Sequence, residues 1–143
     1  MENNCQSCQK ISEGKANVKS YQYWVLEHVA EPVPVKGWMI LRLKRHGEGL
    51  ESLNAEESKE LGEVLSGLPK AIQEITKAKT VYLCSFNESV PHLHFHFIPR
   101  YVQETRRTIE FFTLQNEVKS GKVPAVDSKE VDEFVNNLKD LLK

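Results

Sequence analysis

The chain has 143 residues, with 19 lysines and arginines, 20 aspartates and glutamates, and a formal net charge of −1. This length suits one domain with one hydrophobic core, and the charge balance offers none of the basic surface that binds duplex nucleic acid. No apolar run approaches the roughly 18 residues that span a bilayer, so we expect no contact with a membrane. The N-terminus lacks the basic and apolar regions of a secretory signal, which predicts a cytoplasmic protein.

The first part of the chain predicts a polar arm and two strands. Residues 1–19 are polar and carry two of the three cysteines. Aromatic and β-branched residues favour a strand over 21–29 and another over 38–43. Prolines and a glycine lie between these two segments and indicate a turn.

One long helix is predicted after the second strand. Asn54, followed three residues later by Glu57, is typical of a capping box at the start of a helix. Apolar residues then recur at helical spacing over 55–77, so one face of this helix should pack on a core. Pro69 lies inside the pattern, and we expect it to kink or divide the helix.

The second half of the chain predicts a hairpin and two further helices. Residues 80–86 and 92–98 favour strands, and the short link between them predicts an antiparallel hairpin. Residues 106–118 and 128–142 show helical patterns. Strands grouped around one long helix, with further helices at the end, indicate the α+β class rather than a βαβ repeat.

The most informative segment is 92–97, in which histidine and apolar residues alternate. On a strand, this alternation places His92, His94 and His96 on one face and the apolar residues on the buried face. Alternate residues lie about 6.6 Å apart, so one phosphate can touch two imidazoles. A neutral imidazole can attack phosphorus while a protonated neighbour donates to an oxygen. A metal site built from this cluster alone and a solvated histidine-rich face are the alternatives.

The sequence resembles the histidine triad family. Segment 92–98 is similar to the family's signature of three histidines alternating with apolar residues, and the resemblance covers roughly residues 5–101. Four flanking segments also resemble the family, namely Pro99-Arg100, Glu88-Ser89-Val90, Gly37-Trp38-Met39-Ile40-Leu41 and Arg45-His46.

The resemblance implies an antiparallel sheet of about five strands that carries the triad, with one long helix packed against it. The chain then divides into a Cys-x-x-Cys arm at 1–19, a core at 20–101 and a C-terminal helical extension at 102–143. Family members commonly pair as homodimers through the helix and a sheet edge, so a homodimer is expected here too.

The resemblance also implies a nucleotide hydrolase. His94 would attack the α-phosphorus of a nucleotide, and water would resolve the nucleotidyl-histidine intermediate. His96 would hydrogen-bond the phosphate oxygens, His92 would lie beside them, and Ser89 would contact the phosphate or the leaving group. Substrates of this kind include dinucleoside polyphosphates and nucleoside phosphoramidates. A nucleotidyl transferase, and a nucleotide-binding sensor with little turnover, are the alternatives.

Three features of this region leave alternatives open. Ser89 could simply cap a turn. Glu88 stands where the family often has glutamine, and a carboxylate there could repel a phosphate or act as a base. The acidic residue that usually binds the ribose hydroxyls is not evident, and Glu27 and Glu31 are the candidates to replace it.

Cys5-x-x-Cys8 indicates a metal site or a redox pair more than a structural disulfide. Structural zinc takes four ligands, and His46 and His92 are candidates for the other two because neither is needed as the nucleophile. A zinc-bearing branch of the histidine triad family, which the first residues resemble, uses this same set. The alternative is a frayed terminus with two free thiols.

Four other residues near the motif invite a functional role. Trp38 is expected to pack in the core, with stacking on a base as a secondary possibility. Lys44, Arg45 and Arg100 lie near the predicted phosphate site, although solvated strand ends explain them equally well.

Overall fold

The structure is a computed structural model and describes residues 4–14 and 18–143. In chain order its elements are α1 (Gln6–Ser12), β1 (Lys19–Ser20), β2 (Trp24–His28), β3 (Met39–Leu43), the 3-10 helix η2 (Leu50–Ser52), α2 (Ala55–Thr76), β4 (Thr80–Cys84), β5 (His94–Arg100), α3 (Glu110–Lys119) and α4 (Ser128–Leu141). The strands form one five-stranded sheet in the order β1-β2-β3-β5-β4, antiparallel at every pairing. The α+β class and the hairpin of β4 with β5 are therefore confirmed.

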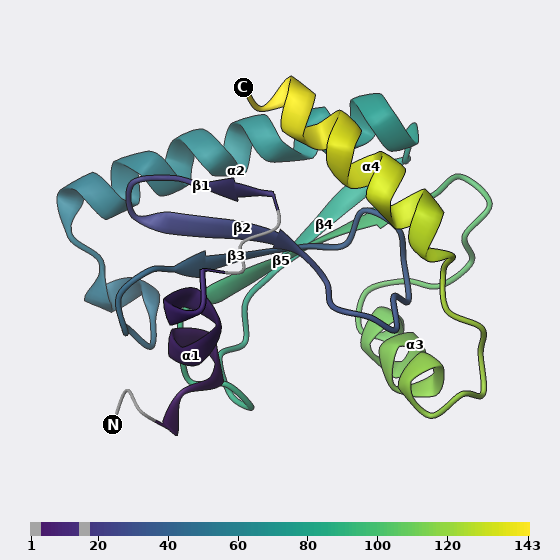
Figure 1. Ribbon diagram of the computed structural model, residues 1–143, viewed down its shortest axis with the longest axis horizontal. Helices are drawn as coiled ribbons and strands as arrows, with labels where there is room; N and C mark the ends of the chain where they lie inside the picture. Colours follow the sequence, from purple (N-terminus) through teal and green to yellow (C-terminus); the bar gives the residue numbers. More distant parts are fainter. Residues whose placement is uncertain (1–3, 15–17) are drawn as a thin grey trace.

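The register of β3 and β5 gives the sheet two different faces. Arg42 lies opposite His94, and Ile40 lies opposite His96. Since side chains alternate along a strand, these four residues share one face, which we call the histidine face. Phe95 and its apolar neighbours point to the other face and are buried there. In Figure 1, α2 and α4 lie on one side of the sheet, while α1 and α3 lie on the other side at opposite ends.

The long helix α2 begins where the capping box predicts. Glu57 N donates to Asn54 Oδ1 at 2.9 Å, and Asn54 N donates to Glu57 Oε2 at 3.0 Å. Arg45 donates to both carboxylate oxygens of Glu57 at 2.6 and 2.8 Å. The start of α2 is therefore linked to the end of β3, and this link places the buried face of the helix on the sheet.

Pro69 does not divide the helix, which was one of the two outcomes expected for it. α2 continues through this residue as one helix of 22 residues. A proline inside a helix lacks its N–H donor and crowds the carbonyl four residues back, at a cost of about 3 kcal/mol. Leu68 and Ile72, on either side, are almost completely buried. Burial of this face stabilises the helix enough to offset the cost of one proline.

The triad is not contained within one strand, contrary to the sequence-based expectation. β5 begins at His94, and His92 lies in the bend before it. Pro91 has no N–H for the strand ladder, and His92 N donates to Val90 O at 2.8 Å in a local turn. The side chain of His92 is consequently free to turn away from the face that carries His94 and His96.

Two elements that precede the core were not predicted as such. α1 is a helix of seven residues within the polar arm, and β1 is a strand of two residues that pairs with β2. Both are too short to show a hydrophobic period in the sequence. α3 begins at Glu110 rather than at 106, because Thr108, with φ of 46°, is not helical.

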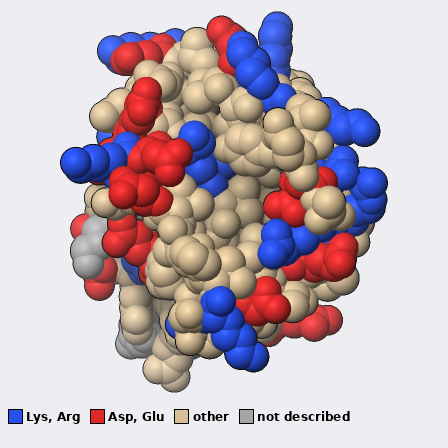
Figure 2. Space-filling model, turned by 90° about the vertical axis from the view of Figure 1, so that its right-hand side faces the viewer, with Lys and Arg blue, Asp and Glu red and all other residues tan. Residues whose placement is uncertain are grey.

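Figure 2 shows the molecule from the side on which α3 and α4 lie. Positive and negative side chains are interspersed there around an area without charged residues, as the near-neutral composition predicts. None of the described helices is both long and apolar enough to cross a membrane.

The capping box provides a direct test of the fold. We expect Asn54→Ala to lower the free energy of unfolding by about 1 kcal/mol, because Glu57 N loses its acceptor at the first turn of α2. Asn136→Ala, an exposed position within α4, should change it by less than about 0.5 kcal/mol. Urea denaturation of the two variants and the wild type measures both values. Equal stability of all three proteins would contradict this account of the helix start.

Candidate functional site

His94 is oriented by a hydrogen bond to the preceding histidine. Its Nδ1 lies 2.6 Å from the backbone carbonyl oxygen of His92. A carbonyl oxygen only accepts, so Nδ1 must carry the proton and Nε2 must carry the lone pair. The ring is half-buried on the histidine face, 5.1 Å from the ring of His96 between centroids. An unprotonated Nε2 on this face is the atom that can act as a nucleophile.

Two side chains that sequence analysis missed fix the backbone of His94. Asn87 Oδ1 accepts from His94 N at 3.1 Å, and Ser85 Oγ donates to His94 O at 2.6 Å. Ser85 and Asn87 also hydrogen-bond each other. Asn87 has φ of 57°, a left-handed conformation that asparagine tolerates better than most residues. Its place between two strands resembles an ordinary turn, so the sequence carries little signal for this role.

His96 has the opposite tautomer. Trp38 Nε1 donates to His96 Nδ1 at 3.0 Å. Since the indole N–H can only donate, His96 Nδ1 is the acceptor and its Nε2 carries the proton. Phe112 from α3 packs edge-on against the same ring, 5.2 Å away between centroids. Trp38 lies in the core as expected, and it also orients His96 as an N–H donor.

Burial keeps both imidazoles neutral. Burial, with smaller contributions from the charges of His94 and Arg42, lowers the pKa of His96 to about 4. Burial is also the main cause of the lowered pKa of His94, whose hydrogen bond to the His92 carbonyl acts in the opposite direction. At neutral pH the histidine face therefore presents one lone pair and one N–H, without a positive imidazole.

An apolar cavity of about 350 Å³ lies beside His96. Phe112, which touches the His96 ring, forms part of its wall. Its lining also includes Tyr82, Cys84, Phe86, Ile98 and Ile109. A cavity of this size with few polar groups suits an uncharged ring or an aliphatic group.

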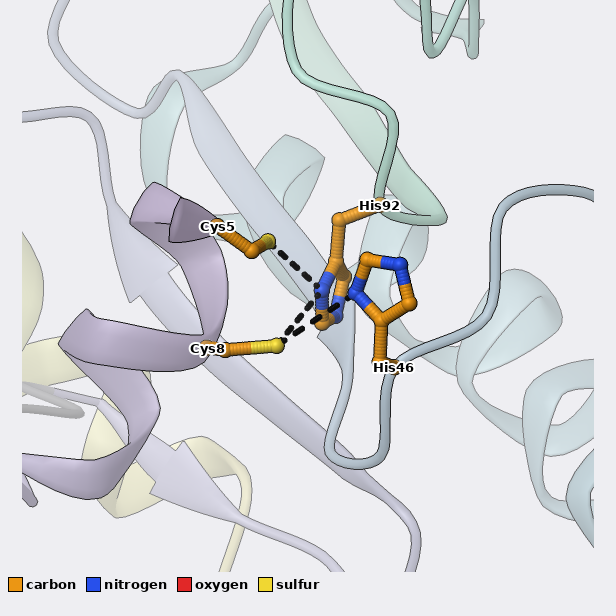
Figure 3. Close-up of side chains that lie close together, drawn as sticks. All are labelled: Cys5, Cys8, His46 and His92. Carbon is orange, nitrogen blue, oxygen red and sulfur yellow. Dashed lines mark hydrogen bonds between the residues drawn. The ribbon is translucent and has the colours of Figure 1, made fainter. Parts of the chain in front are cut away.

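Four side chains form a Cys₂His₂ cluster, as the sequence predicts (Figure 3). Cys5 and Cys8 come from the start of α1, His46 from the loop after β3, and His92 from the bend before β5. Their ligand atoms all lie within 4.8 Å of one another, and Figure 3 shows them pointing toward a common centre. The cysteines are not joined by a disulfide.

The distances within this cluster fit tetrahedral coordination. Cys5 Sγ lies 3.4 Å from His92 Nδ1, and Cys8 Sγ lies 3.5 Å from Nδ1 of both His46 and His92. Zinc bonds of about 2.3 Å to sulfur and about 2.0 Å to nitrogen give a tetrahedral S···N edge of about 3.5 Å. His92 Nε2 donates to Leu43 O at 2.6 Å, which leaves Nδ1 unprotonated for a metal.

The structure separates the remaining predicted residues from the triad. Ser89 and Glu88 are exposed, and no described contact joins either side chain to His94 or His96. Ser89 instead lines a cavity together with Cys5 and His46.

The three predicted cationic residues have structural contacts. Lys44 donates to Tyr21 O, Arg45 pairs with Glu57, and Arg100 donates to the carbonyl oxygens of Glu104 and Arg106. Sequence analysis missed Arg42, a buried cation on the histidine face that pairs with Glu27. One signal was available, because Arg42 is the only charged residue in the otherwise apolar strand β3.

The buried His96 makes stability depend on pH. Its pKa in the folded state, about 4, lies below the ordinary value of about 6.5, so the unfolded chain binds more protons between these values. We expect the free energy of unfolding to fall as the pH drops from about 6.5 toward 4. Urea denaturation across this range measures the loss, and NMR titration of His96 measures its pKa. His96→Phe is the control and should show a shallower dependence, whereas an ordinary His96 pKa would refute the prediction.

Comparisons with known proteins identify the fold. No family model matches the sequence, and no curated protein does. Solved structures do match. A zinc-bound histidine triad family protein of Mycobacterium smegmatis has a TM-score of 0.72 at 15% identity over 99% of this chain and 95% of the other. A histidine triad protein of Bradyrhizobium japonicum has a TM-score of 0.70 at 21% identity over 94% and 95%.

A third solved structure, the Hit-like protein of Bartonella henselae with an unknown ligand, has a TM-score of 0.68 at 16% identity over 97% of each chain. These identities establish the fold rather than a shared activity. The five-stranded antiparallel sheet agrees with that fold, with His94 and His96 on β5 and His92 in the bend before it. The chain has the histidine triad fold, and it carries the three histidines from which that fold takes its name.

Proposed function

We propose that the protein cleaves a nucleotidyl bond at the α-phosphorus through a covalent intermediate on His94. The observation that supports this most directly is the hydrogen bond from His94 Nδ1 to the His92 carbonyl, which leaves Nε2 with its lone pair. A covalent intermediate divides one difficult displacement into two easier steps.

The two steps balance without a cofactor. Nε2 of His94 forms a bond to phosphorus while the bond from phosphorus to the leaving group breaks. The positive charge that develops on the ring is stabilised by the His92 carbonyl, which already accepts from Nδ1. Water then attacks phosphorus, the P–N bond breaks, and its electron pair returns to Nε2. The nucleoside monophosphate leaves and the proton of the water is released to solvent.

His96 supports both steps as a donor. Its Nε2–H, set by the Trp38 hydrogen bond, can donate to a non-bridging phosphate oxygen as negative charge develops there. Ser89 and Glu88 lie in the loop before the triad, and in this proposal they contact the phosphate or the leaving group from there. Their exposure leaves them accessible to a bound substrate.

The nucleoside side of the substrate is less defined. Of the two candidate ribose ligands, Glu27 pairs with Arg42 and Glu31 is exposed. The apolar cavity beside His96 suits a base or an apolar leaving group. Dinucleoside polyphosphates and nucleoside phosphoramidates both satisfy this description. A transferase differs only in the acceptor that replaces water, and dependence of the rate on that acceptor would identify it.

We propose that the Cys₂His₂ cluster binds one structural zinc ion. Two thiolates and two imidazoles are a closed set for zinc, and the S···N distances match a tetrahedral edge. Bound there, zinc supplies structural cross-linking rather than an open coordination position for substrate. His92 would then be fixed at Nδ1 by the metal and at Nε2 by Leu43 O, which orients the carbonyl that accepts from His94.

The homodimer stays a prediction. β4 is one of the two edge strands of the sheet, and Leu83 on it is 48% exposed. Such an edge can pair with a second copy of the chain.

The covalent mechanism predicts a transient mass. Wild-type protein mixed with diadenosine tetraphosphate or an adenosine phosphoramidate should gain one adenylyl group, seen by intact mass at early times. His94→Ala should lose both this adduct and turnover, with a fall in rate of about 10³-fold or more. Asn136→Ala, an exposed change on α4 away from the triad and the Cys₂His₂ cluster, should behave like the wild type. Turnover that survives in His94→Ala would rule out this nucleophile.

The zinc proposal has its own matched control. Protein purified without chelators should contain about one zinc per chain, and Cys5→Ser should lose it and melt at a lower temperature. Cys84→Ser should keep the metal, because Cys84 lies in β4 outside the cluster. Elemental analysis with thermal denaturation measures both quantities. Equal metal content in the two variants would contradict the assignment of Cys5.

A further inference from the structure

A buried arginine lies next to the proposed nucleophile. Arg42 is directly opposite His94 in the pairing of β3 with β5, and both lie on the histidine face. The arginine is only 7% exposed, and the other four residues of β3 are apolar. An arginine is rarely buried to this degree unless it is paired. Burial of this charge costs desolvation free energy even when the arginine is paired, so its position requires an explanation.

The guanidinium uses only part of its hydrogen-bonding capacity within the described chain. Nη1 donates to Glu27 Oε1, and Nε donates to Ser7 Oγ at 3.2 Å. No described group accepts from Nη2. Among the described residues, no fully buried side-chain nitrogen or oxygen lacks a partner. Nη2 must therefore reach a surface that solvent or a ligand can contact.

The charge of this side chain acts on the triad. Burial lowers the pKa of Arg42 to about 10, so the guanidinium stays positive at neutral pH. Burial is the main cause of the lowered pKa of His94 and of His96, and the positive charge of Arg42 contributes to both. The cation is consequently close enough to influence the atoms that would contact a phosphate, whereas the two imidazoles carry no charge themselves.

We propose that Arg42 is a phosphate-binding residue, which donates from Nη2 to a non-bridging oxygen of the phosphoryl group at His94. This inference deepens the proposed function and rests on it, because the anion concerned is the group that His94 attacks. A guanidinium offers five N–H donors in a fixed plane, so Arg42 can keep its bonds to Glu27 and Ser7 while it binds an anion.

Glu27 and Ser7 act as positioning residues in this proposal. A buried ion pair seldom stabilises a fold more than apolar residues of the same size would. The pair of Arg42 with Glu27 is thus better explained by a task for the cation than by stability. Ser7 lies between Cys5 and Cys8, so the arm that carries the two thiolates also fixes the guanidinium.

Binding of inorganic phosphate to the zinc-replete full-length chain tests the proposal. NMR titration would compare the wild type with Glu27→Gln, with the double variant Glu27→Gln/Arg42→Met and with Lys59→Met. The double variant replaces both charges, so no unpaired carboxylate is left buried. It should bind phosphate about tenfold more weakly than the wild type or worse, as loss of a charge-assisted hydrogen bond predicts. Glu27→Gln should bind several-fold more tightly, because one negative charge is removed from beside the anion.

Lys59→Met is the matched control for net charge. Lys59 is an exposed cation on α2, on the other side of the sheet, and its variant should bind phosphate as the wild type does. Phosphate affinity in the double variant equal to the wild type, or no saturable binding by the wild type, would overturn the role of Arg42. Failure of the His94 adduct to form leaves this measurement unaffected, so the two proposals can fail separately.

Discussion

The hydrogen bond from His94 Nδ1 to the carbonyl of His92 is the interaction on which the candidate site depends. It assigns the lone pair of His94 to Nε2, and it joins the only two histidines of the triad that are linked by a described hydrogen bond. The carbonyl can hold its position because His92 is fixed at both ring nitrogens, by Leu43 O at Nε2 and by the two thiols at Nδ1. In the proposed mechanism, the reactivity of His94 thus depends on a cluster that need never touch the substrate.

The cluster also reaches the histidine face by a second route. α1 has only seven residues and would be unstable on its own, so its position rests on contacts with the rest of the chain. Those contacts include the Cys₂His₂ cluster and the hydrogen bond that Arg42 donates to Ser7. On the histidine face, His94 is therefore oriented through His92, and Arg42 is oriented through Ser7. Loss of α1 would disturb both residues together, although the sheet itself would lose no strand.

The sequence predicted those features that depend on periodicity or on a local motif. Alternation over 92–97 identified the strand and its two faces, and the capping box located the start of α2. It failed where tertiary contacts decide. Pro91 cannot donate to a strand ladder, and β5 begins only at His94, so His92 lies outside it. Burial of one face kept α2 continuous through Pro69. The four cluster residues came together as expected from the Cys-x-x-Cys spacing and from the resemblance to the zinc-bearing branch of the family.

Positioning residues were harder to find, for a physical reason. Ser85 and Asn87 orient His94 through its backbone, and short polar residues between strands are common whatever they bind. Arg42 could have been found, because a single charge in an apolar strand must be paired or functional.

Electrostatics distinguish this face from a simple cationic phosphate site. Both imidazoles that would contact phosphate are neutral at pH 7, so neither attracts an anion by charge. A neutral His94 is nonetheless what nucleophilic attack requires, since a protonated ring has no lone pair to offer. Attraction of the phosphate and attack on it thus need different groups. A residue that stays charged when buried can attract the anion while His94 stays neutral and keeps its lone pair. Arg42 meets that condition, and in its proposed role the pairing with Glu27 would limit how strongly it holds a phosphate product. A weaker hold on the product favours release once the intermediate has been hydrolysed.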